Sequence, residues 1–175
     1  MKDGSLRRVL MSETRDLHDR LDQAIGVFAD AGAYRGFLTG SYRFRAALEP
    51  RLTDGAWQVQ RLSRLLEQDM ADLDQPRPAL PAAPALEGRA AQAAACYVLE
   101  GSALGARLLA RRAADQGFTA SFGARHLAAQ TAQPDRWRRF LDWLEHADVP
   151  QSQAVDGARD VFGLALSAYG VKAAA

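Results

Sequence analysis

Cysteine and lysine are almost missing from this chain of 175 residues. Cys96 is the only cysteine, so neither an internal disulfide nor a zinc site with several cysteines can form. Lys2 and Lys172 are the only lysines, and the other basic side chains are arginines, which suit carboxylates and flat rings. The formal net charge of +1 excludes the broad positive field of a dedicated nucleic-acid binder.

Several recognisable segments are also absent. The N-terminus has no apolar signal-peptide core, and no uncharged stretch approaches the roughly 20 residues that cross a membrane. These absences predict a cytoplasmic protein with no membrane partner. The sequence also lacks a phosphate-binding glycine loop that ends in lysine, the Glu-x-x-His pairs of di-iron bundles, and any repeat of roughly 20 to 50 residues.

The pattern that is present is helical. Residues between turns are mainly Ala, Leu, Arg, Glu and Gln, which favour helices, and strict alternation of apolar and polar residues is scarce. With 48% hydrophobic residues, the chain is predicted to form one all-α domain over residues 1–175. Four of the seven prolines lie in residues 76–84, which predicts an extended crossover on the surface. The predicted helices cover residues 5–24, 33–50, 62–73, 86–115, 122–130, 135–146 and 150–169.

His18 belongs to the apolar pattern of the first predicted helix. Met11, Thr14, His18, Leu21 and Ile25 recur at spacings of 3, 4, 3 and 4 residues, which predicts that the imidazole shares the buried face. A buried neutral imidazole needs a partner for each ring nitrogen. One interpretation is a core histidine bonded to a carbonyl, and the other is a ligand to a metal such as the iron of haem.

The other two histidines have simpler explanations. His126 has Phe122 one turn earlier and Leu127 beside it, which predicts a packing residue. His146 ends a predicted helix beside Glu145, where a cation at the carbonyl end is favourable. His18 is therefore the preferred candidate for a metal ligand.

Gly101 and Gly105 stand four positions apart in a strong helix pattern, although each glycine there costs about 1 kcal/mol relative to alanine. Together with Ala106 they remove side chains from one strip of the helix, so the backbone can lie against a flat partner and can bend. Two interpretations follow, which are contact with a flat ligand and close packing of two helices through small residues.

The His18 segment and the glycine segment together resemble the haem oxygenases, particularly the bacterial branch that forms biliverdin. The resemblance implies His18 as the proximal iron ligand. It also implies a single-domain helical bundle in which haem is sandwiched between the first, proximal helix and a kinked distal helix that contains the glycines. Further segments similar to the family's second helix and its two closing helices are residues 34–38, Tyr42, residues 47–52, residues 137–144 and residues 158–162.

Some positions depart from the family pattern. Many members carry a distal aspartate that organises water beside the iron, and alignment through the two glycines places Ser102 there. Glu100 is the nearest carboxylate, but two residues are about 200 degrees of helix, so it should point elsewhere. Glu145 stands where the animal enzymes have an arginine that grips a haem propionate, and Ala106 replaces the second glycine of a common pair. Two other readings therefore stay open, which are a non-enzymatic haem-binding or carrier protein and a helical interaction domain.

The family reaction treats haem as both cofactor and substrate. O2 and electrons from an external donor of the ferredoxin or reductase type open the ring at a meso carbon, giving biliverdin, carbon monoxide and iron. The resemblance implies that Gly101, Ser102 and Gly105 form the catalytic distal surface, where backbone groups hold water and the serine hydroxyl assists. The biliverdin would serve either iron recovery or a bilin-binding photoreceptor.

The anionic propionates of haem need arginine or tyrosine at the mouth of the pocket. Arg15, one turn before His18, is the best candidate, and its alternative is an exposed arginine paired with Asp19. Phe162 on the last predicted helix would lie against the haem edge or fill the core. The further candidates for the propionates are Tyr97, Arg107, Arg111, Arg138 and Arg139.

Overall fold

Helices form the framework of the protein. The computed structural model describes residues 5–53 and 57–171, and these ranges contain no β-strand, only isolated bridges at Thr119. The predicted all-α fold is confirmed. In chain order the helices are α1 (Leu6–Glu13), α2 (Arg15–Ile25), α3 (Ala31–Leu48), η1 (Glu49–Arg51), α4 (Ser63–Asp72), α5 (Gly88–Gly101), η2 (Ser102–Gly105), α6 (Ala106–Asp115), α7 (Arg125–Thr131), α8 (Arg136–Glu145) and α9 (Gln151–Ala168).

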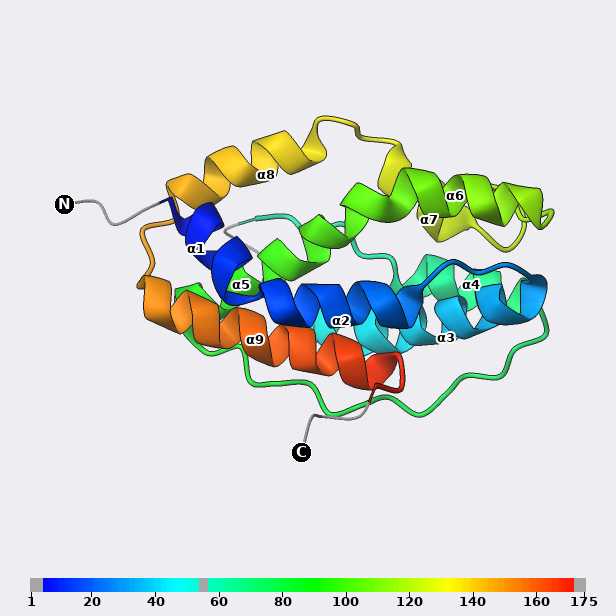
Figure 1. Cartoon of the computed structure of the whole chain (residues 1–175), viewed down its shortest axis with the longest axis horizontal. Helices are drawn as coiled ribbons and strands as arrows, with labels where there is room; N and C mark the ends of the chain where they lie inside the picture. Colours follow the sequence, from blue (N-terminus) through cyan, green and yellow to red (C-terminus); the bar gives the residue numbers. More distant parts are fainter. Residues whose placement is uncertain (1–4, 54–56, 172–175) are drawn as a thin grey trace.

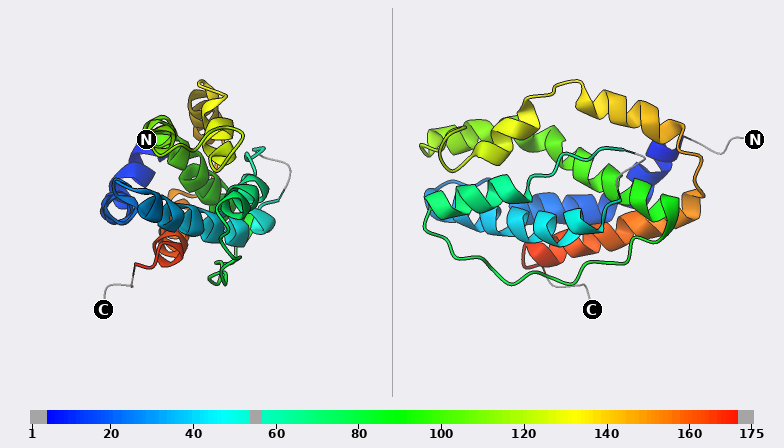
Figure 2. Two further views of the ribbon diagram at one scale, coloured as in Figure 1. Left: turned by 90° about the vertical axis from the view of Figure 1, so that its right-hand side faces the viewer. Right: turned by 180° about the vertical axis from the view of Figure 1, so that it is seen from behind.

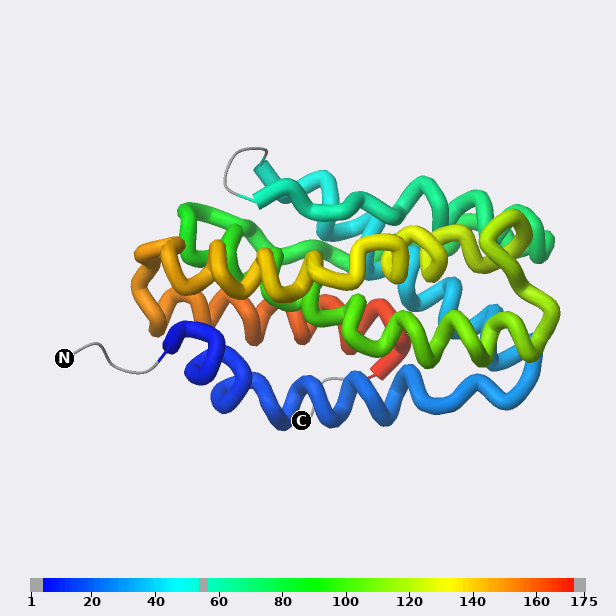
Figure 3. Tube along the Cα trace, turned by 90° about the horizontal axis from the view of Figure 1, so that it is seen from above, coloured from blue at the N-terminus to red at the C-terminus, as the bar shows by residue number. Residues whose placement is uncertain are grey.

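The first predicted helix is in fact two helices. Thr14 separates α1 from α2, with φ −117° and ψ 9°. Its hydroxyl donates to the Leu10 carbonyl at 2.7 Å, and its backbone N–H donates to the same carbonyl. A threonine hydroxyl that bonds to the carbonyl four residues earlier bends a helix, and Figures 1 and 3 show the change of direction between α1 and α2.

The remaining predicted helices are present with shifted ends. Asp30 caps α3, because its carboxylate accepts a hydrogen bond from the Ala33 N–H at 2.8 Å. Gly170, at φ 78°, follows the end of α9. The proline-rich segment runs in extended form outside the bundle, below α9 in Figure 1, as predicted for a crossover.

α9 organises the bundle. It packs along α5 and also contacts α1, α2 and α3, whereas α3 packs on α4 and α6 packs on α7. Figure 2 shows α6 and α7 together at the end of the molecule away from the N-terminus. The helices therefore form two groups, which the long α3 joins.

Two hydrophobic clusters correspond to these groups. The first contains side chains of α1, α5, α8 and α9, and the second contains side chains of α4, α6 and α7. α3 contributes Phe44 and Leu48 to the first cluster and Phe37 and Leu38 to the second. η2 connects α5, in the first cluster, to α6, in the second. None of the η2 residues is buried.

The predicted bend at the glycines is confirmed. The predicted helix over residues 86–115 is α5 and α6 with the 3-10 turn η2 between them, so the regular α-helix ends at Gly101 and resumes at Ala106. By length and composition alone, the stretch Gly88–Asp115 is apolar enough to cross a membrane. No such stretch was predicted from the sequence. Because α5 packs along α9 and 44% of the apolar window is buried, we assign α5 to the core of the protein, whereas η2 has no buried residue.

Glycines allow two close contacts between helices. A Cβ at Gly157 of α9 would lie 3.1 Å from the Ala91 Cα of α5. A Cβ at Gly40 of α3 would lie 2.2 Å from the Tyr169 ring, whose hydroxyl is hydrogen-bonded to Ser41 at 2.8 Å. Small residues therefore set the approach of α9 to both of these helices.

Gly40→Ala should destabilise the protein by about 1 to 3 kcal/mol, because the restrained Tyr169 ring must move. Gly36→Ala is the matched control on α3. Its Cβ would meet nothing within 4 Å, so it should stabilise the helix by about 0.5 to 1 kcal/mol. Urea unfolding followed by circular dichroism measures both changes, and equal midpoints would show that Gly40 is no contact point.

Candidate functional site

His18 is not buried, so the prediction that it shares a buried face is wrong. Its side chain is 58% exposed, and no described residue of α2 is buried. The hydrophobic pattern predicted which face of α2 turns towards the bundle, but that face is only partly covered: Leu17 and Leu21 pack on the first cluster and Ile25 on the second. The interpretation of His18 as a core histidine bonded to a carbonyl is therefore also wrong.

Two neighbours orient the His18 ring. Nδ1 lies 3.3 Å from the Asp22 carboxylate, one turn further along α2. The Phe162 ring of α9 meets the imidazole edge to face, with 6.2 Å between centroids. A carboxylate at Nδ1 favours the tautomer with the proton on that nitrogen, which leaves the Nε2 lone pair for a metal. The structure thus brings together His18 and Phe162, and Phe162 also belongs to the core.

The glycines of the distal segment, which we define as Gly101 to Ala106, do not pack closely against another helix. A Cβ at Gly105 would meet nothing within 4 Å, and one at Gly101 would only touch Trp137 at 3.9 Å. The close-packing interpretation therefore fails for Gly105. Leu104 and Leu108, on the same segment and the following turn, are exposed. In Figure 1 the break between α5 and α6 lies above α2, the helix that carries His18, and α6 continues past the end of α2.

The Ser102 hydroxyl is hydrogen-bonded to three other residues of the protein. Its hydroxyl donates to the Leu99 carbonyl at 2.6 Å and accepts hydrogen bonds from Arg45 at 3.1 Å and from Gln130 at 3.4 Å. Arg45 was missed by the sequence analysis, which treated this part of α3 only as similar to the family's second helix. The Leu-Glu pair at residues 48–49 was the available signal, because Glu49 is the carboxylate partner of Arg45.

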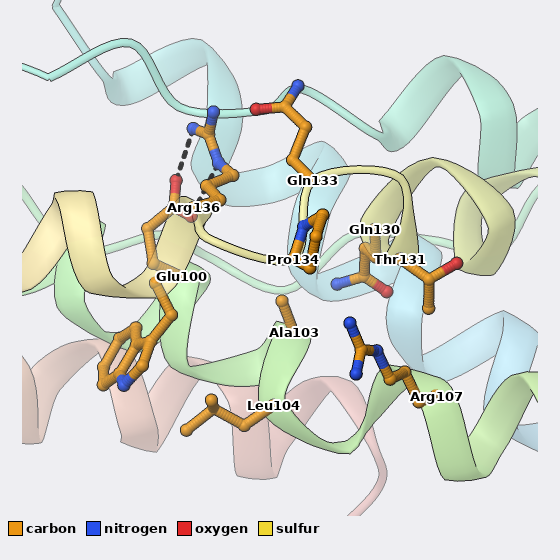
Figure 4. Close-up of a pocket in the computed structure, with 10 residues that line it drawn as sticks. Glu100, Ala103, Leu104, Arg107, Gln130, Thr131, Gln133, Pro134 and Arg136 are labelled. Atoms are coloured by element: carbon orange, nitrogen blue, oxygen red, sulfur yellow. Dashed lines mark hydrogen bonds and ion pairs between the residues drawn. The ribbon is translucent and has the colours of Figure 1, made fainter.

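Glu100 points away from Ser102, as the helical geometry predicted. Its carboxylate accepts hydrogen bonds from Arg136 of α8 at 2.6 Å and 2.8 Å and from the Trp57 indole N–H at 2.8 Å. Beside this group is a cavity of about 190 Å³, bounded by α8, the end of α7 and the distal segment. In Figure 4 the Arg107 side chain, a predicted propionate ligand, extends into this cavity towards Gln130.

The other predicted propionate ligands are spread over four helices, α2, α5, α6 and α8. Arg15 is exposed on α2, and no ion pair with Asp19 is present among the described residues. Tyr97 of α5 is half-buried beside Trp137, with 6.1 Å between ring centroids, and burial raises the pKa of its hydroxyl. Arg111, Arg138 and Arg139 are exposed, and Arg139 is paired with Asp135 and hydrogen-bonded to Gln133.

His126 is a buried packing residue, as predicted. Its Nδ1 lies 2.8 Å from the buried Asp69 carboxylate, which also accepts backbone N–H groups of His126 and Arg125. Burial lowers the pKa of His126. Burial also disfavours ionised Asp69, but the hydrogen bonds outweigh it and lower the pKa of that carboxyl. His146 ends α8 and bonds to the Asp142 carbonyl at 2.7 Å, in keeping with the prediction.

No group of three or more His, Cys, Asp and Glu side chains in residues 5–53 and 57–171 could hold a metal ion. A metal bound by protein side chains alone is therefore not indicated for this part of the chain. A haem iron needs only one protein ligand, because the porphyrin supplies four nitrogens. His18 has the accessible nitrogen and the carboxylate partner for that role.

Gly105→Leu should leave the unfolding free energy of the ligand-free protein within about 0.5 kcal/mol of the original, because no neighbour is displaced. Gly157→Leu is the control, and the crowded contact with Ala91 should cost at least about 1 to 3 kcal/mol. Guanidinium unfolding measures both. A large loss for Gly105→Leu would mean that the distal segment packs against protein.

The free energy of unfolding should decrease as the pH drops below about 6.5, the pKa of histidine in an unfolded chain. Below that pH the unfolded chain binds a proton at His126, whereas burial disfavours the protonated imidazole in the folded protein. The contribution of Asp69, whose folded pKa is also lowered, is lost at still lower pH. In His126→Asn the urea midpoint of unfolding should depend less on pH between pH 7 and 5, roughly the range in which an unfolded histidine titrates. His146→Asn, at an exposed site, should keep the original slope. Equal slopes in both variants would contradict this assignment.

Comparison with known sequences finds two relatives that cover most of this chain. The chain is 30% identical over 151 residues to a heme oxygenase of Xanthomonas campestris pv. campestris (strain 8004), covering 80% of this chain and 91% of that protein. It is 30% identical over 171 residues to heme oxygenase PigA of Pseudomonas aeruginosa, covering 85% and 83%. No protein-family model matches the sequence.

The fold is similar to that of the heme oxygenase from Neisseria meningitidis, solved with NO and CO bound. The TM-score is 0.76, the sequence identity is 22%, and the match covers 99% of this chain and 96% of that one. Neither the haem-carrier reading nor the interaction-domain reading finds support among these relatives. With two relatives at this identity and coverage, the chain belongs to the haem oxygenase family.

Proposed function

We propose that this protein opens haem at a meso carbon to biliverdin, with release of carbon monoxide and iron. One observation carries the proposal: α2 carries the accessible imidazole of His18, and the helix break between α5 and α6, where the Cβ position of Gly105 is open, lies over α2 in Figure 1. A flat ligand between these two elements would meet a nitrogen donor on one face and bare backbone on the other.

The residues present fit haem. The exposed side chains of Met11, Leu104 and Leu108 offer apolar surface that a porphyrin would cover. His18 would hold the iron through Nε2, while Asp22 and Phe162 hold the ring in orientation. When bound, haem supplies the redox-active iron and is also the substrate whose ring is oxidised.

The distal segment offers backbone groups rather than an acid. The hydroxyl proton of Ser102 is used by the Leu99 carbonyl, and Glu100 is bound to Arg136. N–H and C=O groups near Gly101 and Gly105 can hold ordered water with little side-chain bulk around them. Such a surface suits a reaction that must avoid the strong acid-base pair of a peroxidase.

Arginines and a tyrosine would bind the propionates at the edge of the site. Arg15 stands one turn before His18, and Tyr97, Arg107 and Arg138 are the further candidates. Electrons would come from an external donor of the ferredoxin or reductase type, and O2 from solution. A soluble, cytoplasmic protein of a single domain fits this chemistry, with biliverdin production serving iron recovery or a bilin-binding photoreceptor.

Addition of haem, then of a reductant and O2, tests the proposal by visible spectroscopy. A haem oxygenase gives a bilin spectrum, a haem carrier gives an unchanged haem spectrum, and an interaction domain gives no bound haem. Either of the last two results would reject the proposed function.

His18→Ala should abolish the iron-histidine stretch in the resonance Raman spectrum of the ferrous haem complex, because the only proposed protein ligand is removed. His146→Ala is the control, since His146 lies at the end of α8 and should leave the band unchanged. If the band survives in His18→Ala, the ligand is another residue.

A further inference from the structure

Arg45 is a buried cation on α3, only 5% exposed. One end of its guanidinium, Nη1, donates to the Gln60 carbonyl at 3.0 Å and lies 3.4 Å from the Glu49 carboxylate. The other end, Nη2, donates to the Ser102 hydroxyl at 3.1 Å and to the Leu99 carbonyl at 3.4 Å. One side chain therefore links the interior of α3 to the end of α5 and the first residue of η2.

The position of η2 needs such a link, because η2 has little packing of its own. None of its residues is buried, and it connects α5 in the first cluster to Ala106 in the second. Gly105 contributes no side chain and has open space around its Cβ position. Hydrogen bonds from neighbouring elements must therefore hold the turn.

Arg45 and Ser102 act as a unit in this arrangement. The serine proton goes to Leu99, so the oxygen lone pairs face the donors from Arg45 and Gln130. Nη2 donates two hydrogen bonds: one to Ser102, within the distal segment, and one to Leu99, two residues before that segment begins. Loss of Nη2 removes the link between α3 and this turn and leaves the Glu49 contact intact.

We propose that Arg45 is a positioning residue, which holds in place the distal turn between α5 and α6, where alignment with the family places an aspartate at the position of Ser102. This inference rests on the proposed function for its catalytic consequence. Its structural part concerns the ligand-free protein and can be measured separately.

Three variants separate the contributions. Arg45→Lys keeps a cation near Glu49 but cannot supply both ends of the guanidinium fork. Arg45→Met combined with Glu49→Gln removes the cation without leaving a buried unpaired carboxylate, and the glutamine oxygen can still accept the Leu62 N–H. Arg125→Met combined with Asp72→Asn is the matched control, because that ion pair joins α7 to α4 and does not touch η2.

Amide hydrogen exchange of residues 99–106 in the ligand-free protein is the first measurement. Both Arg45 variants should exchange at least about tenfold faster there, because charge-assisted hydrogen bonds to the turn are lost. The control should exchange in this segment at the original rate. Thermal unfolding of each variant shows whether the change is local or general.

The haem complex gives the second measurement. In both Arg45 variants ring opening should slow by about tenfold or more, while the haem dissociation constant changes by less than about threefold, since His18 is untouched. The control should keep its rate. If the original protein binds haem but forms no bilin, the proposed function fails, and the exchange result still decides whether Arg45 positions the turn.

Two results would overturn the inference. Unchanged exchange of residues 99–106 in the Arg45 variants would mean that other contacts hold the turn. Full rescue of exchange and ring opening by lysine would mean that charge alone matters, not the two-ended reach of the guanidinium.

Discussion

The fold depends on a buried ion pair where α3 ends and η1 begins. Arg45 and Glu49 lie one turn apart with side chains that are 6% and 2% exposed, so both charges leave water on folding. Such a pair offsets its desolvation only when its remaining hydrogen bonds are also made. Glu49 accepts from the backbone N–H groups of Leu62 at 2.7 Å and Ser63 at 3.1 Å, which are at the start of α4. The pair thus joins α3 to α4 through one partner and to the distal segment through the other.

Glycine has two different uses in this chain, and their surroundings distinguish them. Gly40 and Gly157 lie where a Cβ would collide with Tyr169 or Ala91, so they set the distance between helices. Gly105 has no such neighbour. The helix-propensity cost of this glycine is therefore not offset by helix packing, which leaves access to the backbone as its use.

Local signals in the sequence predicted most of the fold. Turn residues and helical periodicity located the helices, and the two glycines located the break after α5. The division at Thr14 was missed because a side chain that bonds to its own helix leaves no trace in hydrophobic periodicity.

The candidate site was less predictable. The choice of His18 as the iron ligand stays a prediction, whereas its predicted burial was wrong, because periodicity does not say what covers a face of a helix. Arg45 was missed because its partners Leu99 and Ser102 are more than 50 positions away in the sequence. Contacts of that kind depend on how α3 and α5 cross, which no local pattern specifies.

The pairing of polar groups around the distal segment limits the chemistry available there. Glu100 faces α8 and is held by Arg136 and Trp57, while the Ser102 hydroxyl is held by Arg45 and Leu99. Neither group can act as a free acid without breaking a buried network, and that would cost more than the loss of an exposed contact. Protons at this surface would therefore be delivered by water bound to backbone groups. The Ser102 oxygen accepts a hydrogen bond from Arg45 while its proton is donated to the Leu99 carbonyl, so the bond to Leu99 is what keeps this hydroxyl from acting as an acid.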